Sequence, residues 1–587
     1  MGVLAEELKP AGGAALDQVL IASGVALVLT AVLLALGYGH RTGRLRVLDT
    51  LASLGARGVG RGLPGWASLP SIVAMLALMT ALLGMYWDIS LHITHGRDEG
   101  PLANIAHYPI LIGLFGIFAA GLIALTMPVG EKPGPAPLRV TRTWYVPAGG
   151  ALVVGAGFYA LIGFPLDDVW HRIFGQDVTL WGPTHLMLIG GAGLSLVGML
   201  VLEREGRAAA GDTVPSPAIA YLRRGMTCGG LLIGLSVFQA EFDFGVPQFR
   251  LVNQPFLIAL AAGCALVTAR LWVGRGGAIL AAVFYLLVRG GVSLAVGPVI
   301  GELNAAVPMY LAEAVLIELV ALALIKRPMV FGVVSGAVVG TAGFAAEYAW
   351  TQVAFRLPWT TDILVEGVLM ALAGGLSGAV LGVLLAEGLA GRLPRPAVSR
   401  SLFAGSLLVI GAAVANCLIF TVPKDMRVSA ELSADGNAVF TLSRPLDDPA
   451  WIQVTSWQGG DGLHVDRLEK TGPATYRTTE PMPLDGTWKT LVRIHDGRSL
   501  AAVPVFLPAD PVIGAKELPA EPRFTRDVQG EQPILQRELK QDVPGWIWAA
   551  ASLVVLLCTL ILVFALGWGV SRTARAVAAR PEARSDA

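Results

Sequence analysis

The stretch from Thr184 to Leu202, "THLMLIGGAGLSLVGMLVL", decides the fold class of this chain. It holds no Asp, Glu, Lys or Arg, and as a helix it is long enough to cross a bilayer core about 30 Å thick. The whole chain has the same character, because 54% of its 587 residues are hydrophobic and only 15% are charged. Soluble proteins carry roughly 25% charged residues. The mean hydropathy of +0.64 therefore predicts many apolar spans and an integral membrane protein.

About thirteen segments of the sequence are apolar and long enough to span a bilayer as helices. The 71 glycines fit helices that pack closely in lipid, where small residues let backbones approach. We therefore expect an all-α polytopic membrane domain over residues 1–421 and one further helix near the C-terminus. The expected spans are 17–38, 68–88, 108–127, 145–165, 184–202, 225–242, 254–272, 277–298, 306–325, 329–350, 363–386, 402–421 and 545–569.

Basic residues predict the orientation of these spans, because cytoplasmic loops carry an excess of Lys and Arg. With the N-terminus outside, basic stretches such as "HRTGRLR", residues 40–46, fall on the cytoplasmic side, and the loops expected outside hold few Lys or Arg. The C-terminal tail, residues 571–587, is basic and is expected in the cytoplasm. The predicted location is the cell membrane, inner or plasma, with many passes.

Residues 422–510 alternate apolar and polar positions, as in "AWIQVTSW", and turns such as "QGGDG" separate these runs. The pattern predicts an extracytoplasmic β-sandwich of immunoglobulin or cupredoxin type, inserted before the last membrane helix at 544–570. Residues 511–543 are rich in Pro, Glu and Gln and are predicted to be a linker. The region lacks cysteine, which excludes a blue-copper site of two His and one Cys, and we expect His464 and His495 on its surface.

Two stretches carry the same polar residues in the same order. They read "DISLHITHGRDEGPLANIAH" over residues 88–107 and "DDVWHRIFGQDVTLWGPTH" over residues 167–185. In each, an Asp is followed four residues later by a His, a further Asp comes six residues after that His, and a second His closes the stretch. Because each stretch lies between an outward and an inward span, we interpret the unit as a helical hairpin that occurs twice.

The spacing predicts a metal site in each hairpin. Residues four apart lie on one face of a helix, and the closing His begins the returning helix, so one carboxylate and two imidazoles can converge on one ion. Such a set suits Zn, Cu(II) or Fe(II) and leaves positions open for water or substrate. The predicted ligands are Asp88, His92, His107, Asp167, His171 and His185. The predicted partners that orient an imidazole are Asp98 and Asp177, and His95 is a spare candidate in the first hairpin.

The second stretch resembles the copper-binding region of the C subunit of particulate methane and ammonia monooxygenases. In that family, an Asp is followed four residues later by a His, and a Trp directly precedes this His. An Arg-Asp pair comes shortly after, and Pro-Ser-His closes the motif. The matching residues here are Asp167, Trp170, His171, Asp177, Pro183, Thr184 and His185. Gln176 stands where the family has Arg, and the two histidines are one residue further apart. The resemblance covers residues from about 80 to 200.

By this resemblance, copper is the expected cofactor, with zinc or iron as other possible metals. The triad of the second hairpin would bind copper, and the triad of the first hairpin is similar to a second metal site of the family, which has Asn in place of the Asp. The resemblance implies a copper-dependent monooxygenase or other oxidoreductase, or a subunit of one. It would act on a small substrate at the outer membrane face, with other membrane subunits or further copies of the chain as partners.

Other functions stay open on the sequence. In a metal-ion transporter or metal-handling protein, the triads would capture the ion, and Glu302, Glu313 and Glu318 would line a path. If their role is structural, Glu313 and Glu318 instead form ion pairs with Arg289 inside the bilayer; otherwise they form a proton path or a cation path. Haem bound by paired histidines would leave the aspartate spacing unexplained. The expected partners are the lipid bilayer and a small substrate or metal ion, and a formal net charge of zero gives no reason to expect nucleic acid.

Overall fold

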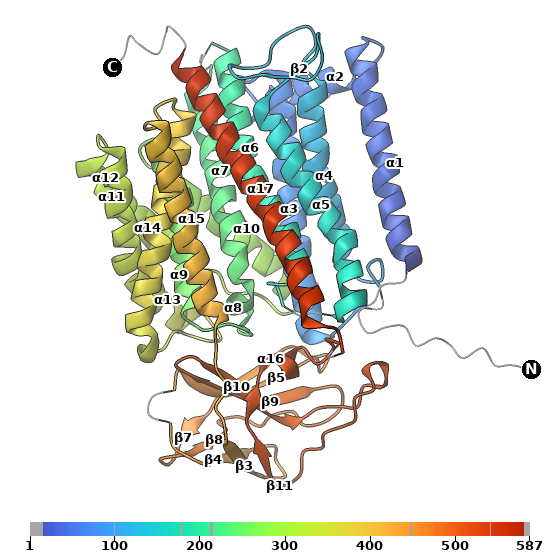
Figure 1. Ribbon diagram of the computed structural model, residues 1–587, viewed down its shortest axis with the longest axis vertical. Coiled ribbons are helices and arrows are strands. Elements are labelled where there is room, and N and C mark those ends of the chain that lie inside the picture. The colour runs from blue at the N-terminus through green and yellow to red at the C-terminus, as the bar shows by residue number, and fades with distance from the viewer. Residues whose placement is uncertain are drawn as a thin grey trace, which may run out of the picture.

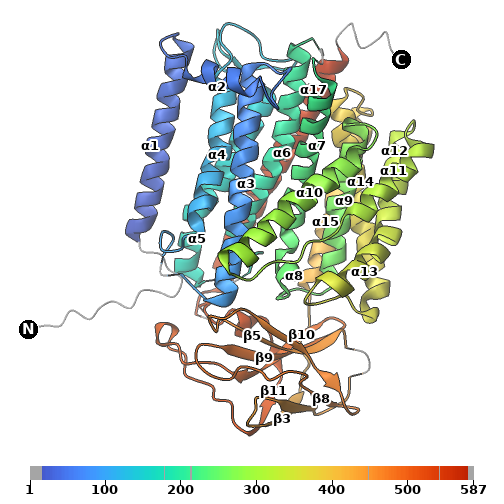
Figure 2. The same cartoon turned by 180° about the vertical axis from the view of Figure 1, so that it is seen from behind.

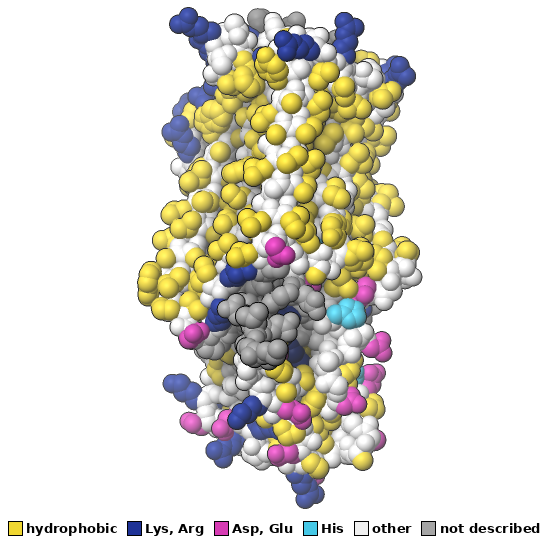
Figure 3. All heavy atoms as spheres, turned by 90° about the vertical axis from the view of Figure 1, so that its right-hand side faces the viewer, with side chains coloured by type: hydrophobic (Ala, Val, Ile, Leu, Met, Phe, Trp, Pro, Cys, Tyr) yellow, Lys and Arg dark blue, Asp and Glu magenta, His cyan; other side chains and the backbone are white. Residues whose placement is uncertain are grey.

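The computed structural model describes residues 16–98, 100–176, 179–211, 215–446, 449–540 and 542–579. Within this part of the chain, twelve helices are long and apolar enough to cross a membrane. They pack side by side as a bundle, and a β-rich region lies at one end of it (Figure 1). The flank of the bundle drawn in Figure 3 is covered by hydrophobic side chains, and Lys and Arg stand at the end far from the β-rich region. The chain is therefore a multi-pass membrane protein.

The helices have the following bounds: α1 (Leu16–Arg41), α2 (Val47–Gly55), α3 (Gly65–Thr94), α4 (His107–Thr126), α5 (Ala148–Phe174), α6 (Pro183–Ala209), α7 (Pro217–Ser236), α8 (Ala240–Phe244), α9 (Asn253–Trp272), α10 (Gly277–Leu294), α11 (Leu311–Leu324), α12 (Pro328–Val338), α13 (Phe344–Ala354), α14 (Leu364–Leu389), α15 (Pro396–Leu418), α16 (Gln532–Leu535) and α17 (Gly545–Ala578). A two-stranded hairpin, β1 (Leu138–Arg139) and β2 (Tyr145–Val146), joins α4 to α5.

The ninth predicted span, 306–325, is wrong in its first part. Helix α10 continues into a π-helical turn, Ala295–Ile300, and residues 301–310 are not helical. Helix α11 has 14 residues, about 21 Å at 1.5 Å per residue, which is shorter than a bilayer core. Pro298 and Pro308 lack the backbone N–H that a continuous helix needs, which accounts for the break.

The last helix is longer than its prediction. We expected a span over 544–570 followed by a tail, whereas α17 has 34 residues and continues to Ala578. The first part of the predicted tail is thus helical, and residues 580–587 lie outside the described part of the chain. Arg572 and Arg575 lie on this extension, where Arg572 donates to the carbonyl oxygens of Ala136 and Pro137.

Small residues let the central helices approach each other closely. Gly374, Gly378 and Gly382 lie four residues apart on α14 and therefore on one face. A Cβ built at Gly374 would lie 2.3 Å from the carbonyl oxygen of Phe256 on α9, and one at Gly378 would lie 2.4 Å from that of Leu260. Only glycine leaves room for this contact between backbones, as expected for helices that pack in lipid.

The β-rich region near the C-terminus is a sandwich of two five-stranded antiparallel sheets. The strand orders are β12-β10-β9-β5-β6 and β11-β3-β4-β8-β7. Val428 and Phe440 of one sheet share an apolar core with Val454 and Val492 of the other. The strands are β3 (Arg427–Leu432), β4 (Ala438–Leu442), β5 (Trp451–Trp457), β6 (His464–Arg467), β7 (Glu469–Lys470), β8 (Thr475–Arg477), β9 (Lys489–Asp496), β10 (Ser499–Phe506), β11 (Arg523–Asp527) and β12 (Gln529–Gly530).

The predicted linker, 511–543, is wrong in its middle, because it completes both sheets. Strand β11 pairs with β3, and β12 pairs with β10. The next residue, Glu531, is buried and lies 2.9 Å from both Arg493 Nε and His495 Nε2. His495 is therefore only 2% exposed, against the prediction of a surface residue. These pairings join segments far apart in the chain, so local composition could not indicate them.

One sheet of the sandwich lies against the ends of the membrane helices. In β3 and β4 every second residue is buried, whereas β5 is buried along its whole length and β9 and β10 nearly so. One face of β5, β9 and β10 packs on the other sheet, and the opposite face packs on the helices, where Trp451 joins their core. Figure 2 shows the same contact from behind. The sandwich thus caps the end of the bundle where both Asp/His hairpins turn.

Candidate metal centres

The first hairpin brings four side chains together at the turn between α3 and α4. Asp88 and His92 lie one turn apart near the end of α3, and His107 begins α4. His107 Nε2 lies 3.1 Å from Asp88 Oδ1, and His92 Nε2 lies 3.4 Å from the same oxygen. Asp98, in the loop between the helices, places its Oδ2 3.5 Å from both Nε2 atoms. We call Asp88, His92, Asp98 and His107 the first centre.

The second hairpin repeats this arrangement between α5 and α6. Asp167 and His171 lie one turn apart near the end of α5, and His185 lies in the first turn of α6. His185 Nε2 is 3.3 Å from Asp167 Oδ1, and His171 Nε2 is 3.8 Å from Asp167 Oδ2. We call these three residues the second centre. Within each centre, the possible ligand atoms all lie within 4.8 Å of one another.

Backbone carbonyls orient the closing histidine of each centre in the same way. His107 Nδ1 lies 2.8 Å from the carbonyl oxygen of Pro101, and His185 Nδ1 lies 2.7 Å from that of Thr179. In both hairpins, the carbonyl comes from the residue six positions before the histidine. A carbonyl oxygen only accepts hydrogen bonds, so Nδ1 carries a proton and Nε2 faces the carboxylates. This is the support that metal-binding histidines usually have.

The donor set fits a transition-metal ion. In the first centre, His92 Nδ1 also lies 2.9 Å from a backbone carbonyl oxygen, that of Gly96. If the imidazole is neutral, its Nε2 presents a lone pair to a carboxylate oxygen, and the two atoms repel unless a metal ion lies between them. The alternative is a second proton on the imidazole, at Nε2, which turns the contact into an ion pair. Two ligands held at about 2.1 Å by one tetrahedral ion lie about 3.4 Å apart. The Nε2–oxygen distances in the first centre, 3.1 to 3.5 Å, match this spacing.

Buried or half-buried polar side chains hold the carboxylates of both centres. Asn104 Nδ2 donates to Asp88 Oδ1 at 2.6 Å and to Asp98 Oδ2 at 3.1 Å. In the second centre, Thr184 Oγ1 donates to Asp167 Oδ1 at 2.6 Å. The sequence predicted Asp98 as a residue that orients an imidazole, whereas the structure places its carboxylate among the possible ligand atoms. The first centre therefore has four possible ligands where three were predicted.

The two remaining predicted site residues are not part of the described centres. Asp177 lies outside the described residues, so its predicted role is not tested. His95 lies in the hairpin loop with its side chain half exposed, and its Nε2 is 3.4 Å from Glu302 Oε1 rather than within the first centre. Glu302 also accepts a hydrogen bond from Thr94 Oγ1, at the end of α3.

Glu241 of α8 positions the loop that orients the second centre. Its Oε1 accepts hydrogen bonds from Thr179 Oγ1 at 2.6 Å and from the backbone N–H of Leu180 at 2.8 Å. Its Oε2 accepts from the backbone N–H of Gln248. Because the Thr179 carbonyl orients His185, Glu241 acts on the second centre through this loop. The sequence marks Glu241 only as an acidic residue at a helix end, and no spacing rule links it to a hairpin about 60 residues earlier.

The sandwich reaches the first centre through Gln458. Its Nε2 donates to the carbonyl oxygen of His92 at 3.1 Å, and its backbone N–H donates to that of Ile93 at 2.9 Å. Gln458 has a φ of 61°, a conformation that residues other than glycine rarely adopt. Lys489 Nζ donates to Gln458 Oε1 and also pairs with Glu538, and burial lowers the pKa of this ammonium group. A strained residue is thus fixed where the two domains meet.

Arg97 ties the loop of the first centre to the sandwich. Its two terminal nitrogens donate to the two carboxylate oxygens of Asp510 at 2.6 and 2.9 Å. The hydrogen bond from Arg97 is the main cause of the lowered pKa of Asp510, and partial burial opposes it. Arg97 immediately precedes Asp98 in the chain. The position of Asp98 in the first centre therefore depends on the sandwich.

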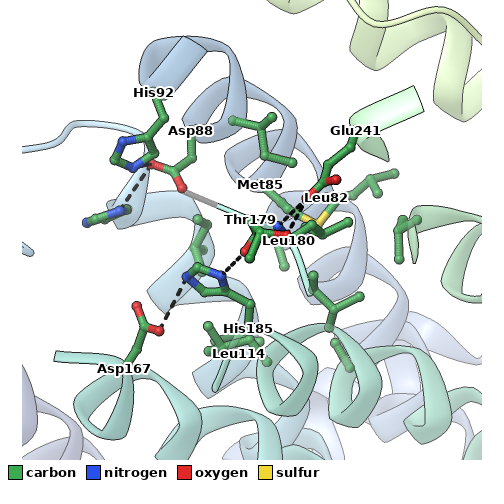
Figure 4. A pocket seen from close by; sticks show the side chains of 18 of the residues that line it. Leu82, Met85, Asp88, His92, Leu114, Asp167, Thr179, Leu180, His185 and Glu241 are labelled. Carbon is green, nitrogen blue, oxygen red and sulfur yellow. Dashed lines mark hydrogen bonds and ion pairs between the residues drawn. The ribbon is translucent and has the colours of Figure 1, made fainter. Parts of the chain in front are cut away.

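Both centres face one cavity of about 290 Å³ (Figure 4). Its walls are mostly apolar and come from the helices, while the sandwich contributes Trp457 and Gln458. Phe164 lies between the hairpins, with its ring edge-on to that of His107 at 5.6 Å between centroids. A cavity near 300 Å³ accommodates a small molecule, and polar groups gathered at one end of it would determine how that molecule lies.

The acidic residues that were predicted to pair with Arg289 have other surroundings. Arg289 Nη2 lies 2.9 Å from Asp243 Oδ2, so the predicted pairing with Glu313 and Glu318 is wrong. Glu318 pairs instead with Arg270 of α9 at 2.7 Å. The partner of each charge depends on which helices are neighbours, and the sequence does not state this.

Comparisons of the chain with protein-family models, with curated proteins and with solved structures found no match.

Proposed function

We propose that this chain is a membrane metalloprotein in which each Asp/His centre holds a transition-metal ion. The observation that carries the proposal is the convergence of two imidazole Nε2 atoms and carboxylate oxygen, found twice with the same backbone support. One such cluster could be a set of ion pairs between imidazolium and carboxylate. Two clusters that share the closing-histidine contact with a carbonyl six residues upstream favour metal ligation.

Copper is the first candidate for the metal, and zinc or iron are the alternatives. Nitrogen and oxygen donors without thiolate are compatible with all three. The resemblance of residues 167–185 to the C subunit of particulate methane and ammonia monooxygenases favours copper. A bound copper ion would supply redox chemistry at the end of the cavity. The chain's own residues would hold the ion, and the apolar walls would bind a small substrate and exclude water.

The function that these observations support best is oxidation of a small substrate at the outer face of the cell membrane. The sandwich would lie on that outer side, because Lys and Arg stand at the opposite end of the bundle (Figure 3). Labelling of single cysteines introduced at exposed positions of the sandwich, such as Arg523, would test the sidedness in intact cells. Labelling only after the cells are opened would contradict the outer location.

The metal proposal is tested on the purified full-length chain by metal analysis and electron paramagnetic resonance. We expect bound metal and, for copper, a Cu(II) signal with splitting from nitrogen ligands. His185→Ala should remove the contribution of the second centre and leave that of the first. His464→Ala is the matched control, since His464 lies on β6 in neither centre, and it should leave the signal unchanged.

Two outcomes would change the proposal. A chain purified without metal, and unable to take up Cu(II), Zn(II) or Fe(II), would show that the centres are ion pairs only. Metal binding with no oxidation of any small substrate in the presence of the metal would instead support metal capture for transport or delivery. Oxidation and metal capture both require ligation but differ in turnover, so an assay of substrate oxidation by the metal-loaded chain separates them.

A further inference from the structure

A second polar site lies among α10 to α13 and shares no residue with the two centres. The chain is not helical over residues 301–310 between α10 and α11. A π-helical turn, Val339–Gly343, joins α12 to α13 within one long helix. Figure 2 shows α10, α11, α12 and α13 on the same flank of the bundle. Irregular backbone at membrane depth is tolerated where protein covers it and side chains satisfy its polar groups. Broken helices of this kind are also where membrane proteins place ion sites.

Side chains of α13 form hydrogen bonds with the polar backbone groups of the irregular segment. Glu347 accepts hydrogen bonds from the backbone N–H of Met309 at 3.2 Å and of Tyr310 at 2.7 Å. Trp350 Nε1 donates to the carbonyl oxygen of Val307 at 2.8 Å. Both carboxyl oxygens of Glu347 therefore accept a hydrogen bond from a backbone N–H. Its structural task is clear: it caps the start of α11.

Glu313 has such support for at most one of its two carboxyl oxygens. It lies in the first turn of α11, is 1% exposed, and its Oε2 is buried without a hydrogen-bond partner. A Cβ built at Gly343 would lie 2.9 Å from Glu313 Cγ, so the glycine makes room for this side chain. Gly343 and Glu347 are four residues apart on one face of a helical segment. The Glu313 carboxyl, with Oε2 unpaired, thus lies beside the Glu347 carboxyl, whose two oxygens are hydrogen-bonded.

The charged groups around Glu313 do not neutralise it. On α11 itself, Glu318 is paired with Arg270. From α10, the nearest cation is Arg289, which is paired with Asp243. Tyr285 and Tyr310, whose rings are in contact, are the other titratable groups of this cluster. An ionised carboxylate buried without a partner is very unfavourable, and a second negative charge beside it adds to the cost. The favourable state of Glu313, beside a second buried carboxyl group, is therefore the neutral acid.

We propose that Glu313 is a proton-binding site within the membrane domain, with Glu347 as the neighbouring carboxyl group. The reaction is the transfer of one proton between solvent and the Glu313 carboxylate, and it involves no electrons. Buried polar groups extend from this site, since Gln239 Nε2 donates to Tyr310 Oη and Arg289 bonds Asp243. The site is built from residues that neither metal centre uses, so it stands whether or not those centres hold metal.

Infrared difference spectroscopy on the full-length chain tests the proposal, because the carbonyl stretch of a protonated carboxyl is distinct from that of a carboxylate. The spectrum of the wild-type chain at neutral pH minus that of Glu313→Gln should show the band of one buried carboxylic acid. Glu318→Gln is the matched control, since Glu318 lies on the same helix and is ion-paired, and it should keep the band. The Gln variants keep the size of the side chain, so the fold should be retained.

Deuterium exchange and pH titration distinguish a carboxyl group that exchanges its proton with solvent from one that does not. The band should shift after transfer to D2O and should disappear with a one-proton titration as the pH rises. In Glu347→Gln, which lacks the neighbouring carboxyl group, the Glu313 band should disappear at a lower pH than in the wild type. Identical carboxylic-acid bands in the wild type and in Glu313→Gln would overturn the assignment. A band that never exchanges in D2O would overturn proton exchange at this site.

Discussion

The side-chain amide of Gln458 in the sandwich donates to the carbonyl oxygen of His92 in the membrane domain, at 3.1 Å. This contact joins the cap of the bundle to the first centre. It explains how a domain that supplies none of the possible ligands found in the described residues can still influence them.

Gln458→Ala should weaken metal binding at the first centre and spare the second. The substitution removes the donor to His92 and the acceptor of Lys489, and loss of a group that orients a ligand typically costs 10-fold to 100-fold in metal affinity. Competition titration with a chelator would measure the change. Gln352→Ala, on α13, is the control and should leave both affinities as they are. Equal weakening of both centres would show a global effect of the sandwich instead.

Asn104→Asp should disrupt the first centre more than Asn104→Ala. Alanine removes the donor that Asp88 and Asp98 share, whereas aspartate adds a negative charge 2.6 to 3.1 Å from their oxygens. Without metal, the Asp variant should therefore be the less stable of the two, because like charges at such distances repel. Thermal unfolding of the metal-free and metal-loaded variants would measure this. If the Asp variant instead bound metal as tightly as wild type, Asn104 would not be holding the carboxylates as described.

Glu241→Ala should lower metal affinity at the second centre alone. Glu241 contacts Thr179 and Leu180 and none of the ligands, so the expected effect is a displaced Thr179 carbonyl and a less well oriented His185. A loss of about 10-fold in affinity is the expected order. Glu241→Gln keeps one acceptor oxygen, so its metal affinity at the second centre should lie between those of Glu241→Ala and the wild type. No change in either variant would mean that the loop keeps its position without Glu241.

The sandwich should lose stability in acid through Glu531. Burial raises the pKa of this carboxyl, but the charges of Arg493 and His495 outweigh burial and lower it to about 2 from the usual 4.5. A carboxyl with a lowered folded-state pKa stabilises the fold fully above its unfolded pKa, and this stability is lost as the pH falls from about 4.5 towards 2. The loss should be on the order of 3 kcal/mol.

Thermal unfolding as a function of pH measures this contribution. In Glu531→Gln, the acid-dependent part between pH 4.5 and 2 should be absent, and the variant should be less stable than wild type at neutral pH, because Arg493 is left buried without its partner. Asp527→Asn is the control, since its pairing with Arg427 is on the surface and should contribute little. A wild type and a Glu531→Gln variant with the same pH profile would contradict the assignment.

Much of the site follows from local geometry, which the sequence carries. Asp88 and His92 converge because residues four apart share a helix face, and His107 joins them because a short hairpin returns the chain to the same place. The same rule brings Asp167, His171 and His185 together. The membrane helices could also be predicted from the sequence, because the length of an apolar segment is enough to identify them.

The features that the sequence did not predict depend on contacts between distant segments. Asp98 joins the first centre through a loop whose course Arg97 and Asp510 fix from the sandwich. Strand β11 lies in a segment whose composition is that of a linker, and its pairing with β3 joins residues about 100 positions apart. The sequence did not predict the non-helical segment before α11, because residues 301–310 include an apolar run that continues into the helix.

The amount of metal bound per chain tests the central claim most directly. Purified protein, loaded and then freed of loosely bound ions, is measured by mass spectrometry as wild type, His107→Ala, His185→Ala and the double variant. We predict one ion for each intact centre, so that each single variant loses one of the wild type's ions and the double variant loses both. Metal content that is the same in all four proteins, or no metal in any of them, would contradict the account.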